Sequence, residues 1–249
     1  MIYDCFIFGN EIDLLDIRLH TLNDVVDKFV IVEAYQDFRG QPKPLNFERE
    51  YKRFKQFLSK IIYVTPHLPV IEHNMKDNET EESINFKREF YQRNRIINGL
   101  SKAKEGDIVV ITDSDEIPNP ECIIRYQREN RTVPIRIRQR HFLYKLNYEL
   151  VGQGGNIAPV ICRFSDQLKY PDSLRHIESE IFDNGGWHFS HCGDERRIKE
   201  SFETFSHMEY NFNTSGKFVD IDGGFPKYVV DNKEKFKHLI GEKNLYNGG

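Results

Sequence analysis

Apolar residues in the first 120 positions alternate between uninterrupted runs, typical of buried strands, and the wider spacing of amphipathic helices. One apolar run closes at residues 6–8, and a second occupies residues 29–32. Between these runs, apolar side chains recur at helical spacing, at Leu15, Leu19, Leu22 and Val26. The order predicts a strand, a helix and a second strand at the beginning of the chain.

The same alternation continues to residue 112. Helical spacing from Phe47 to Leu58 predicts a second helix, and the apolar residues 61–64 predict a third strand. A long helix is expected from Ser83 to Lys104, and Gly106 separates it from a strand at residues 107–112. Four strands alternating with three helices predict an α/β fold with a mostly parallel, right-handed central sheet flanked by helices.

The second half of the chain is less regular and more aromatic. Residues 135–137 and 142–144 predict a hairpin, and residues 160–164 predict a further strand. We therefore expect a smaller mixed β region beside the parallel sheet. Asp194 and Glu195 then open a predicted helix with apolar residues along one face.

Length and charge narrow the classes of protein that need to be considered. A chain of 249 residues with 39% hydrophobic content predicts a single domain over residues 1–249. A net charge of -4 gives no basic field for nucleic acid, so we expect no nucleic-acid partner. Without a run of about 18 apolar residues or a signal-like start, we expect a soluble, cytoplasmic protein with no membrane span. The four cysteines form no Cys-x-x-Cys pair and are expected to be reduced thiols.

Two carboxylates follow the predicted strand at residues 107–112. Asp113 and Asp115 are separated by one residue, and Pro118 helps to fix the turn after them. The carboxyl ends of strands are where open α/β sheets bind ligands. Hard oxygen ligands suit Mn²⁺ or Mg²⁺ bridging phosphates, which favours an enzyme that acts on a phosphorylated donor. The alternative is that both acids only cap the next segment.

Three other side chains could belong to such a site. Arg93 lies on the inward face of the third helix, where it could serve the site or extend along the helix edge to solvent. Trp187 and His188 follow two glycines. Together they could form a sugar-stacking surface with a metal ligand beside it, while the alternative is that Trp187 is a core residue.

Five motifs follow one another along the chain: Phe8-Gly9-Asn10-Glu11-Ile12-Asp13, Phe29-Val30-Ile31-Val32-Glu33, Pro42-Lys43-Pro44-Leu45, Asp113-Ser114-Asp115-Glu116-Ile117-Pro118 and Gly186-Trp187-His188-Phe189-Ser190. Their combination is more specific than any one of them. In this order they resemble glycosyltransferase family 17, and the resemblance covers roughly residues 2 to 210. Residues 93–118 also resemble the helix, strand and acidic loop of the β-1,4-galactosyltransferases.

The resemblance implies a GT-A-type fold, a UDP-sugar donor such as UDP-N-acetylglucosamine, and transfer to a glycan acceptor with inversion. Residues 1–118 would bind the nucleotide sugar and metal, and residues 119–249 the acceptor. Two features depart from the family. Ser114 stands where the family usually has Val, and we expect no counterpart of the membrane anchor and stem of the animal enzymes. We therefore expect a different acceptor glycan from theirs.

Under this hypothesis each site residue has a role. Asp115, assisted by Asp113, binds Mn²⁺ or Mg²⁺, and His188 completes the metal shell. Phe8, Glu11 and Glu33 surround the uridine, Arg93 lies near the phosphates or the acidic loop, and Trp187 stacks on a sugar. By resemblance to the galactosyltransferases, Asp194 or Glu195 is the general base, with Glu116 and Glu209 as competitors.

Two other functions remain open. Phosphatases and phosphotransferases also place Asp-x-Asp at a strand end, with the first Asp as covalent nucleophile, which here would be Asp113. They usually carry the motif at the start of the chain, whereas here it follows four strands. A glycan-binding protein of the same fold without turnover is the rival from another class.

Overall fold

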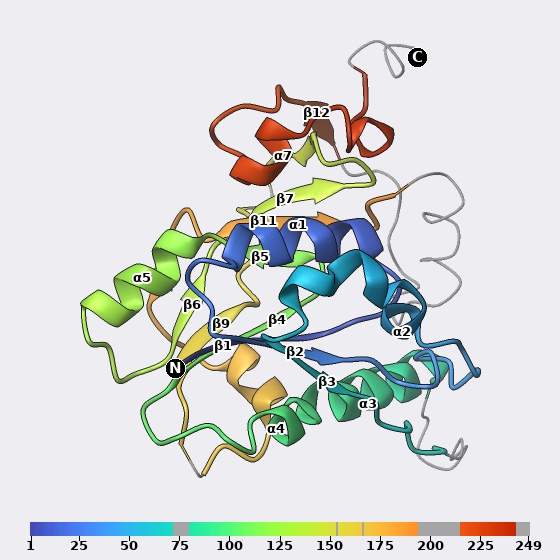
Figure 1. The fold of residues 1–249 in the computed structure, drawn as a ribbon, viewed down its shortest axis with the longest axis vertical. Helices are drawn as coiled ribbons and strands as arrows, with labels where there is room; N and C mark the ends of the chain where they lie inside the picture. The colour runs from blue at the N-terminus through green and yellow to red at the C-terminus, as the bar shows by residue number, and fades with distance from the viewer. Residues whose placement is uncertain (72–79, 153, 166, 194–214, 243–249) are drawn as a thin grey trace.

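The computed structural model describes residues 1–71, 80–152, 154–165, 167–193 and 215–242. Its centre is a seven-stranded sheet in the order β10-β6-β9-β4-β1-β2-β3 (Figure 1). Four neighbouring strands are parallel: β1 (Ile2–Ile7), β2 (Lys28–Val32), β3 (Ile61–Val64) and β4 (Ile108–Asp113). Beyond β4 the sheet is mixed, with β9 (Val160–Arg163), β6 (Ile135–Ile137) and β10 (Ile181–Phe182).

A second sheet of five strands has the order β12-β8-β7-β11-β5. Its strands are β5 (Glu116–Pro118), β7 (Arg140–Leu143), β8 (Tyr148–Leu150), β11 (Gly186–Ser190) and β12 (Gly216–Phe218). The described helices are α1 (Ile12–Leu22), α2 (Asn46–Glu50), α3 (Glu81–Asn94), α4 (Ile96–Gly99), α5 (Pro120–Arg128) and α7 (Lys227–Asp231). Short 3-10 segments are η1 (Tyr51–Phe57), η3 (Pro171–His176) and η4 (Lys237–Leu239).

Helix α1 lies between the two sheets and is buried on both sides (Figure 1). Leu15 and Leu19 pack with Phe6 and Phe29 of the large sheet, whereas Leu14 and Ile17 pack with a second core around Trp187. The opposite face of the large sheet is covered by α3 and α4, and Val30 packs there with Ile96. The molecule is therefore layered, and α1 joins its two hydrophobic cores.

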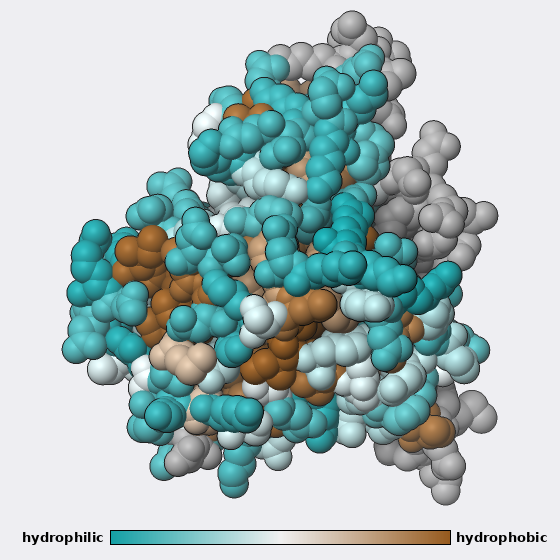
Figure 2. All heavy atoms as spheres, viewed as in Figure 1, coloured by the Kyte–Doolittle hydropathy of each residue, from teal (hydrophilic) through white to brown (hydrophobic). Residues whose placement is uncertain are grey.

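Most of the visible surface of the C-terminal part, around α7 and β12, is hydrophilic (Figure 2). Within the described part of the chain, no helix is long and apolar enough to cross a membrane. All four cysteines are buried free thiols, as predicted.

The strands predicted in the first half are present, and the coarse α/β fold with a mostly parallel central sheet is confirmed. The second predicted helix is wrong in part, because α2 ends at Glu50 and continues as the 3-10 segment η1 with a kink at Phe54. The third is also shorter than predicted and ends at Asn94. The chain then turns at Arg95 so that Gly99 lies directly against Val30, where an added Cβ would be only 2.2 Å from the Val30 Cγ1.

The predicted hairpin at residues 135–144 is wrong. β6 belongs to the seven-stranded sheet and β7 to the five-stranded sheet. Between them the chain passes from one sheet to the other at Gln139, whose backbone pairs with Asn156 and whose side chain donates to the carbonyl of Ile117 at 3.0 Å. Alternating apolar residues identify such strands but not the sheet to which each belongs.

The order of the strands creates a switch point between β1 and β4. From β1 the chain moves outward through β2 to β3, and it then returns to place β4 on the other side of β1. Ligands of open α/β sheets bind where the strand order reverses, outside the carboxyl ends of the strands. The loops that follow Ile7 and Asp113 both open at this position.

Candidate active site

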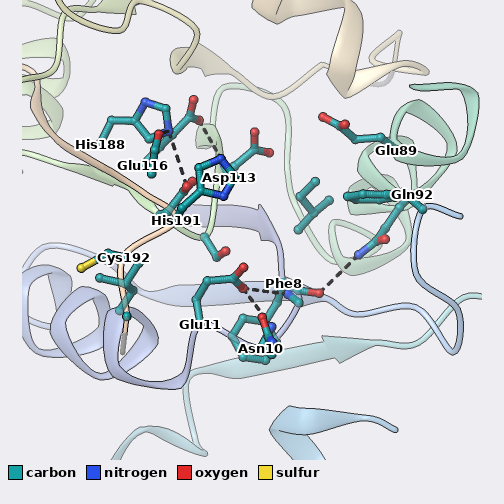
Figure 3. Close-up of a pocket in the computed structure, with 18 of the residues that line it drawn as sticks. Phe8, Asn10, Glu11, Glu89, Gln92, Asp113, Glu116, His188, His191 and Cys192 are labelled. Atoms are coloured by element: carbon teal, nitrogen blue, oxygen red, sulfur yellow. Dashed lines mark hydrogen bonds and ion pairs between the residues drawn. The ribbon is translucent and has the colours of Figure 1, made fainter. Parts of the chain in front are cut away.

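A cleft of about 1180 Å³ lies at the switch point. Its walls come from the loop after β1, the acidic loop after β4, helix α3, the segment after β11, and η3 with residues near Leu239. Figure 3 shows the labelled side chains of Glu11, Asp113, Glu116, Glu89 and His188 brought together from these elements. The cleft thus combines residues that are more than 170 positions apart in the sequence.

The acidic loop, residues 113–116, is held in place by the buried side chain of Arg18. Arg18, on α1, has no exposed surface. Its guanidinium forms a paired contact with Asp4 at 2.6 and 2.7 Å, and it donates to the Thr112 hydroxyl. It also donates to the backbone carbonyls of Asp113 at 2.9 Å and Glu116 at 3.1 Å. Because a planar guanidinium has five fixed donors, it fixes the loop at both of its ends.

Asp113 is surrounded by arginines. Its Oδ1 accepts from Arg93 Nε at 3.1 Å and Nη2 at 2.9 Å, and its Oδ2 accepts from Arg175 Nη2 at 3.1 Å. Burial raises the pKa of Asp113 to about 6, although the two arginines act in the opposite direction. Asp113 lines the cleft with its side chain 24% exposed, but both of its oxygens accept hydrogen bonds from arginines, so its predicted part in binding a metal stays a prediction.

Arg93 is the centre of a buried ion-pair network. Its guanidinium contacts Glu89 at 2.5 Å, Asp172 and Asp113, and its side chain is only 5% exposed. The structure therefore places Arg93 beside the acidic loop, and the alternative of a side chain that extends to solvent is wrong. Because this guanidinium already contacts three carboxylates, it is better suited to fixing Asp113 than to binding a phosphate.

Glu116 belongs to the same network. Its carboxylate accepts from Arg175 at 2.7 and 3.0 Å, from Asn156 at 2.8 Å and from the backbone N–H of Asp113 at 2.8 Å. Burial opposes ionisation, but Arg175 and His188 lower the pKa of Glu116 to about 2. A carboxylate with so low a pKa is a poor general base at neutral pH.

Asp115 and His188 face each other at the cleft. The Asp115 Oδ2 lies 3.5 Å from the His188 Nε2, and both side chains remain about one-fifth exposed, at 20% and 18%. Burial acts against protonation of His188, but Asp115, Glu116 and Asp113 together raise its pKa. Strand pairing explains the position, since His188 of β11 is directly opposite Glu116 of β5.

A hydroxyl joins His188 to a second histidine. Ser190 Oγ lies 2.9 Å from His188 Nε2 and 2.8 Å from His141 Nε2, and the two imidazoles stack at 4.4 Å. Burial and the neighbouring His188 lower the pKa of His141 to about 3, so His141 is neutral. The Nδ1 of His188 is buried without a hydrogen-bond partner. The ring is thus held on one side only.

These positions allow a test of whether a divalent cation fits. Asp115 supplies a hard oxygen, and His188 supplies an imidazole nitrogen that suits Mn²⁺ acceptably. Asp113 does not join them, and within the described ranges no group of three or more His, Cys, Asp or Glu side chains could hold a metal. Among the described residues, Asp115 and His188 are therefore the two best-placed ligands, and water or the phosphates of a bound donor would have to occupy other positions.

Of the three residues predicted to surround the uridine, two line the cleft and one does not. Phe8 and Glu11 line the cleft, and Glu11 accepts from the backbone N–H groups of Gly9 and Asn10 at 3.0 Å each. Glu33 has no exposed surface and does not line the cleft. Its carboxylate accepts from the backbone of Asn46 at 2.6 Å and Phe47 at 3.0 Å, so it fixes the start of α2. The predicted uridine contact of Glu33 is corrected accordingly.

Trp187 is a core residue. It is 8% exposed, packs in the second core and does not line the cleft. Its indole N–H donates to the carbonyl of Gly224 at 2.8 Å. Neighbouring residues of a strand point to opposite faces, so a strand that directs His188 to the cleft directs Trp187 away from it. The predicted sugar-stacking role of Trp187 is therefore wrong.

Comparison with known proteins adds to this geometry. The sequence model of glycosyltransferase family 17 matches residues 1–222. This chain belongs to glycosyltransferase family 17. It is 30% identical over 140 residues to the beta-1,4-mannosyl-glycoprotein 4-beta-N-acetylglucosaminyltransferases of Homo sapiens, Rattus norvegicus and Mus musculus.

The extent of these matches is limited. The 140 residues cover 55% of this chain and 25% of the mammalian proteins, so the match spans about a quarter of their length. Among solved structures, the crystal structure of HddC from Yersinia pseudotuberculosis complexed with GMP-PN has a TM-score of 0.36 and 11% identity, and covers 95% of this chain and 100% of that chain. A similarity of this size carries no conclusion about the fold or the function.

The three acids predicted as candidates for the general base in the second half of the chain cannot be placed. Asp194, Glu195 and Glu209 lie outside the described residues. Sequence reasoning missed Arg18, Arg175 and Asp172. A charged residue among the apolar positions of the first helix was a signal for Arg18, whereas the irregular sequence around Arg175 gave none.

Proposed function

We propose that the protein transfers a sugar, N-acetylglucosamine, from a UDP-sugar donor to a hydroxyl group of a glycan, with inversion at the anomeric carbon. The observation that carries this proposal is the pair Asp115 and His188, which faces an open cleft at the switch point of the sheet. Membership of family 17 and the mammalian N-acetylglucosaminyltransferases to which the chain is similar support the same reaction.

The donor is oriented by the carboxyl ends of two strands. The loop after β1, with Phe8 and Glu11, borders the nucleoside, and the acidic loop after β4 borders the diphosphate. Arg18, Arg93 and Arg175 hold the acidic loop rigid from within. Preorganised polar groups of this kind need little rearrangement when charge develops on the leaving group.

Mn²⁺ or Mg²⁺ is the cofactor that this pair would hold. Bound by Asp115 and His188, the cation would act as a Lewis acid that stabilises the negative charge of the departing UDP. Asp113 takes the supporting role, because its two oxygens are occupied by arginines. His141, through Ser190, restricts the orientation of the His188 ring.

Inversion requires a single displacement. The acceptor oxygen forms a bond to the anomeric carbon from the face opposite UDP while the bond to the diphosphate oxygen breaks and its electron pair leaves with UDP. The hydroxyl proton passes to a carboxylate, a role that we assign to Asp194 or Glu195. Glu116 is a weaker candidate because its pKa is about 2 and Arg175 occupies both of its oxygens.

An assay of UDP release tests the proposed function. The protein is incubated with a panel of UDP-sugars and Mn²⁺, with and without EDTA, and then with a glycan array. We expect UDP-N-acetylglucosamine to give the fastest metal-dependent release, and NMR of the product to show an inverted anomeric centre. Absence of UDP release from every donor, with or without an acceptor glycan, would refute glycosyl transfer.

The same assay distinguishes the rival functions. A phosphotransferase with Asp113 as nucleophile would release phosphate from phosphate esters, but here both Asp113 oxygens accept hydrogen bonds from buried arginines. A glycan-binding protein without turnover would bind the array and release no UDP. The pair of Asp115 and His188 at the cleft favours the transferase over both.

A further inference from the structure

Two exposed aromatic rings lie together beside the cleft: Phe90 lines it, and Tyr170 is stacked with Phe90. Phe90 is 43% exposed and Tyr170 is 59% exposed, whereas most large apolar side chains of the described residues are buried. Their ring centroids are 6.4 Å apart and their planes are within 24° of parallel. The two rings are therefore stacked, and each keeps a large exposed fraction that a ligand could contact.

The pair is continuous with the proposed reaction centre. Phe90 lines the cleft and lies on α3 one turn before Arg93, about 4.5 Å along the helix axis. Tyr170 directly precedes η3, whose Asp172 contacts Arg93 and whose Arg175 contacts Glu116. Both rings are therefore attached to the elements that enclose Asp113.

Helix α3 makes contacts on two sides. Phe90 lies on the side away from the proposed nucleoside position. Gln92 donates to the carbonyl of Val32 at 2.8 Å and Arg88 to that of Phe38 at 3.0 Å, so this face contacts the end of β2 and the loop after it. Phe90, by contrast, pairs with Tyr170 beside η3. A nucleoside at the β1 loop would therefore leave the aromatic pair free.

We propose that Phe90 and Tyr170 form the subsite on which a sugar ring of the acceptor glycan stacks. This inference rests on the proposed function and names the acceptor side of the same cleft. The C–H face of a pyranose packs on an aromatic ring, and its hydroxyls need hydrogen-bonding groups at the edge. Glu89 and Asp172 line the cleft beside the pair, and His176 is 75% exposed next to Asp172.

Steady-state kinetics of single variants test this assignment. Phe90→Ala and Tyr170→Ala are compared with the wild-type protein, using UDP-N-acetylglucosamine and the array glycan to which the wild-type protein transfers fastest. We expect the acceptor KM to rise roughly 3- to 30-fold in each variant, while the donor KM changes less than about twofold. Phe90→Tyr and Tyr170→Phe keep an aromatic face and are expected to retain the wild-type acceptor KM.

Tyr51→Ala is the matched control, because Tyr51 is 43% exposed but does not line the cleft. Its acceptor KM should equal that of the wild type, and thermal melting shows whether each variant is folded. A rise in the donor KM with an unchanged acceptor KM would overturn the assignment and place a donor group on the pair. An unchanged acceptor KM in folded Phe90→Ala and Tyr170→Ala would also overturn it. A wild-type protein that releases no UDP would instead refute the proposed function, so the two failures are distinguishable.

Discussion

At the scale of single residues, the two aspartates of the acidic loop have different surroundings although only Ser114 separates them. Arg18 and Arg93 hold the backbone and side chain of Asp113, whereas Asp115 projects toward His188. Asp115 pairs with one histidine, whereas Asp113 neutralises two buried arginines, and a carboxylate that neutralises buried charges contributes more to stability. The two positions should therefore respond differently to substitution.

Asp115→Ala is expected to abolish metal-dependent UDP release while the free energy of unfolding changes by less than about 1 kcal/mol. The measurement combines the UDP assay in Mn²⁺ with urea unfolding. Asp183→Ala is the control, since Asp183 is an aspartate paired with a basic side chain, Arg138, that lies outside the cleft. Near wild-type turnover of Asp115→Ala would show that Asp115 is not a metal ligand.

Asp113→Ala is expected to lower the free energy of unfolding by about 1–3 kcal/mol, because Arg93 and Arg175 lose a shared partner. This is less than the ~3–5 kcal/mol typical of a broken buried pair, since Asp113 is partly exposed and other carboxylates remain near both arginines. Urea unfolding measures the difference. If Asp113→Ala were as stable as Asp115→Ala, the arginine network would contribute nothing at this position.

Trp187→Ala is expected to destabilise the protein by about 3–5 kcal/mol, because the indole fills the second core and satisfies the Gly224 carbonyl. Thermal and urea unfolding give this value, with the exposed Tyr51→Ala as an aromatic control. A variant that melts like the wild type but binds donor or acceptor weakly would restore the sugar-stacking role that the sequence suggested.

At the scale of elements, short segments depend on side chains from neighbouring strands. Helix α2 has only five residues, and the Glu33 carboxylate at the end of β2 accepts from two of its first N–H groups. Tyr63 of β3 donates to the same carboxylate at 2.8 Å. One buried acid thus joins two strands to a helix that would not form alone.

Glu33→Gln is expected to cost about 1–3 kcal/mol of unfolding free energy, because the amide nitrogen would face donors and leave them unsatisfied. The donor KM should change little. Measuring both quantities decides between the two roles of Glu33, since a raised donor KM at unchanged stability would indicate the nucleoside contact expected from the sequence.

Much of the parallel sheet, and part of the site, could be predicted from the sequence. The apolar runs of β1, β2 and β4 are buried on both faces, and the half-buried run of β3 forms the edge of the sheet, so the pattern predicts these strands and their largely parallel arrangement. The sequence also placed Asp115 and His188 at the site. It could not place Glu33 or Trp187, because their directions depend on contacts with Asn46 and Gly224 that are distant along the chain.

At the scale of the whole molecule, the cleft takes its walls from both sheets and from the loops between them. Because α1 packs against both cores, a ligand in the cleft would contact segments that this helix links. Binding there should therefore stabilise the entire fold rather than one loop.

UDP with Mn²⁺ is expected to raise the melting temperature of the wild-type protein. At about 100 times its Kd, a ligand adds about 2.7 kcal/mol, which corresponds to roughly 5–10 °C for a chain of this size. Differential scanning calorimetry measures the shift, with EDTA and Asp115→Ala as controls. A shift that persists in Asp115→Ala with EDTA would mean that UDP binds without the metal.

The antiparallel pairing of β4 with β9 sets an order of events during translation. Val109 of β4 lies opposite Cys162 of β9, so about fifty residues separate the two partners on the nascent chain. When the acidic loop leaves the ribosome, β4 can already align with β1, but its other edge remains an unpaired apolar strand until residue 163 has emerged. Open strand edges pair readily with other chains. The speed of synthesis through residues 114–163 therefore determines how long each new molecule is exposed to aggregation.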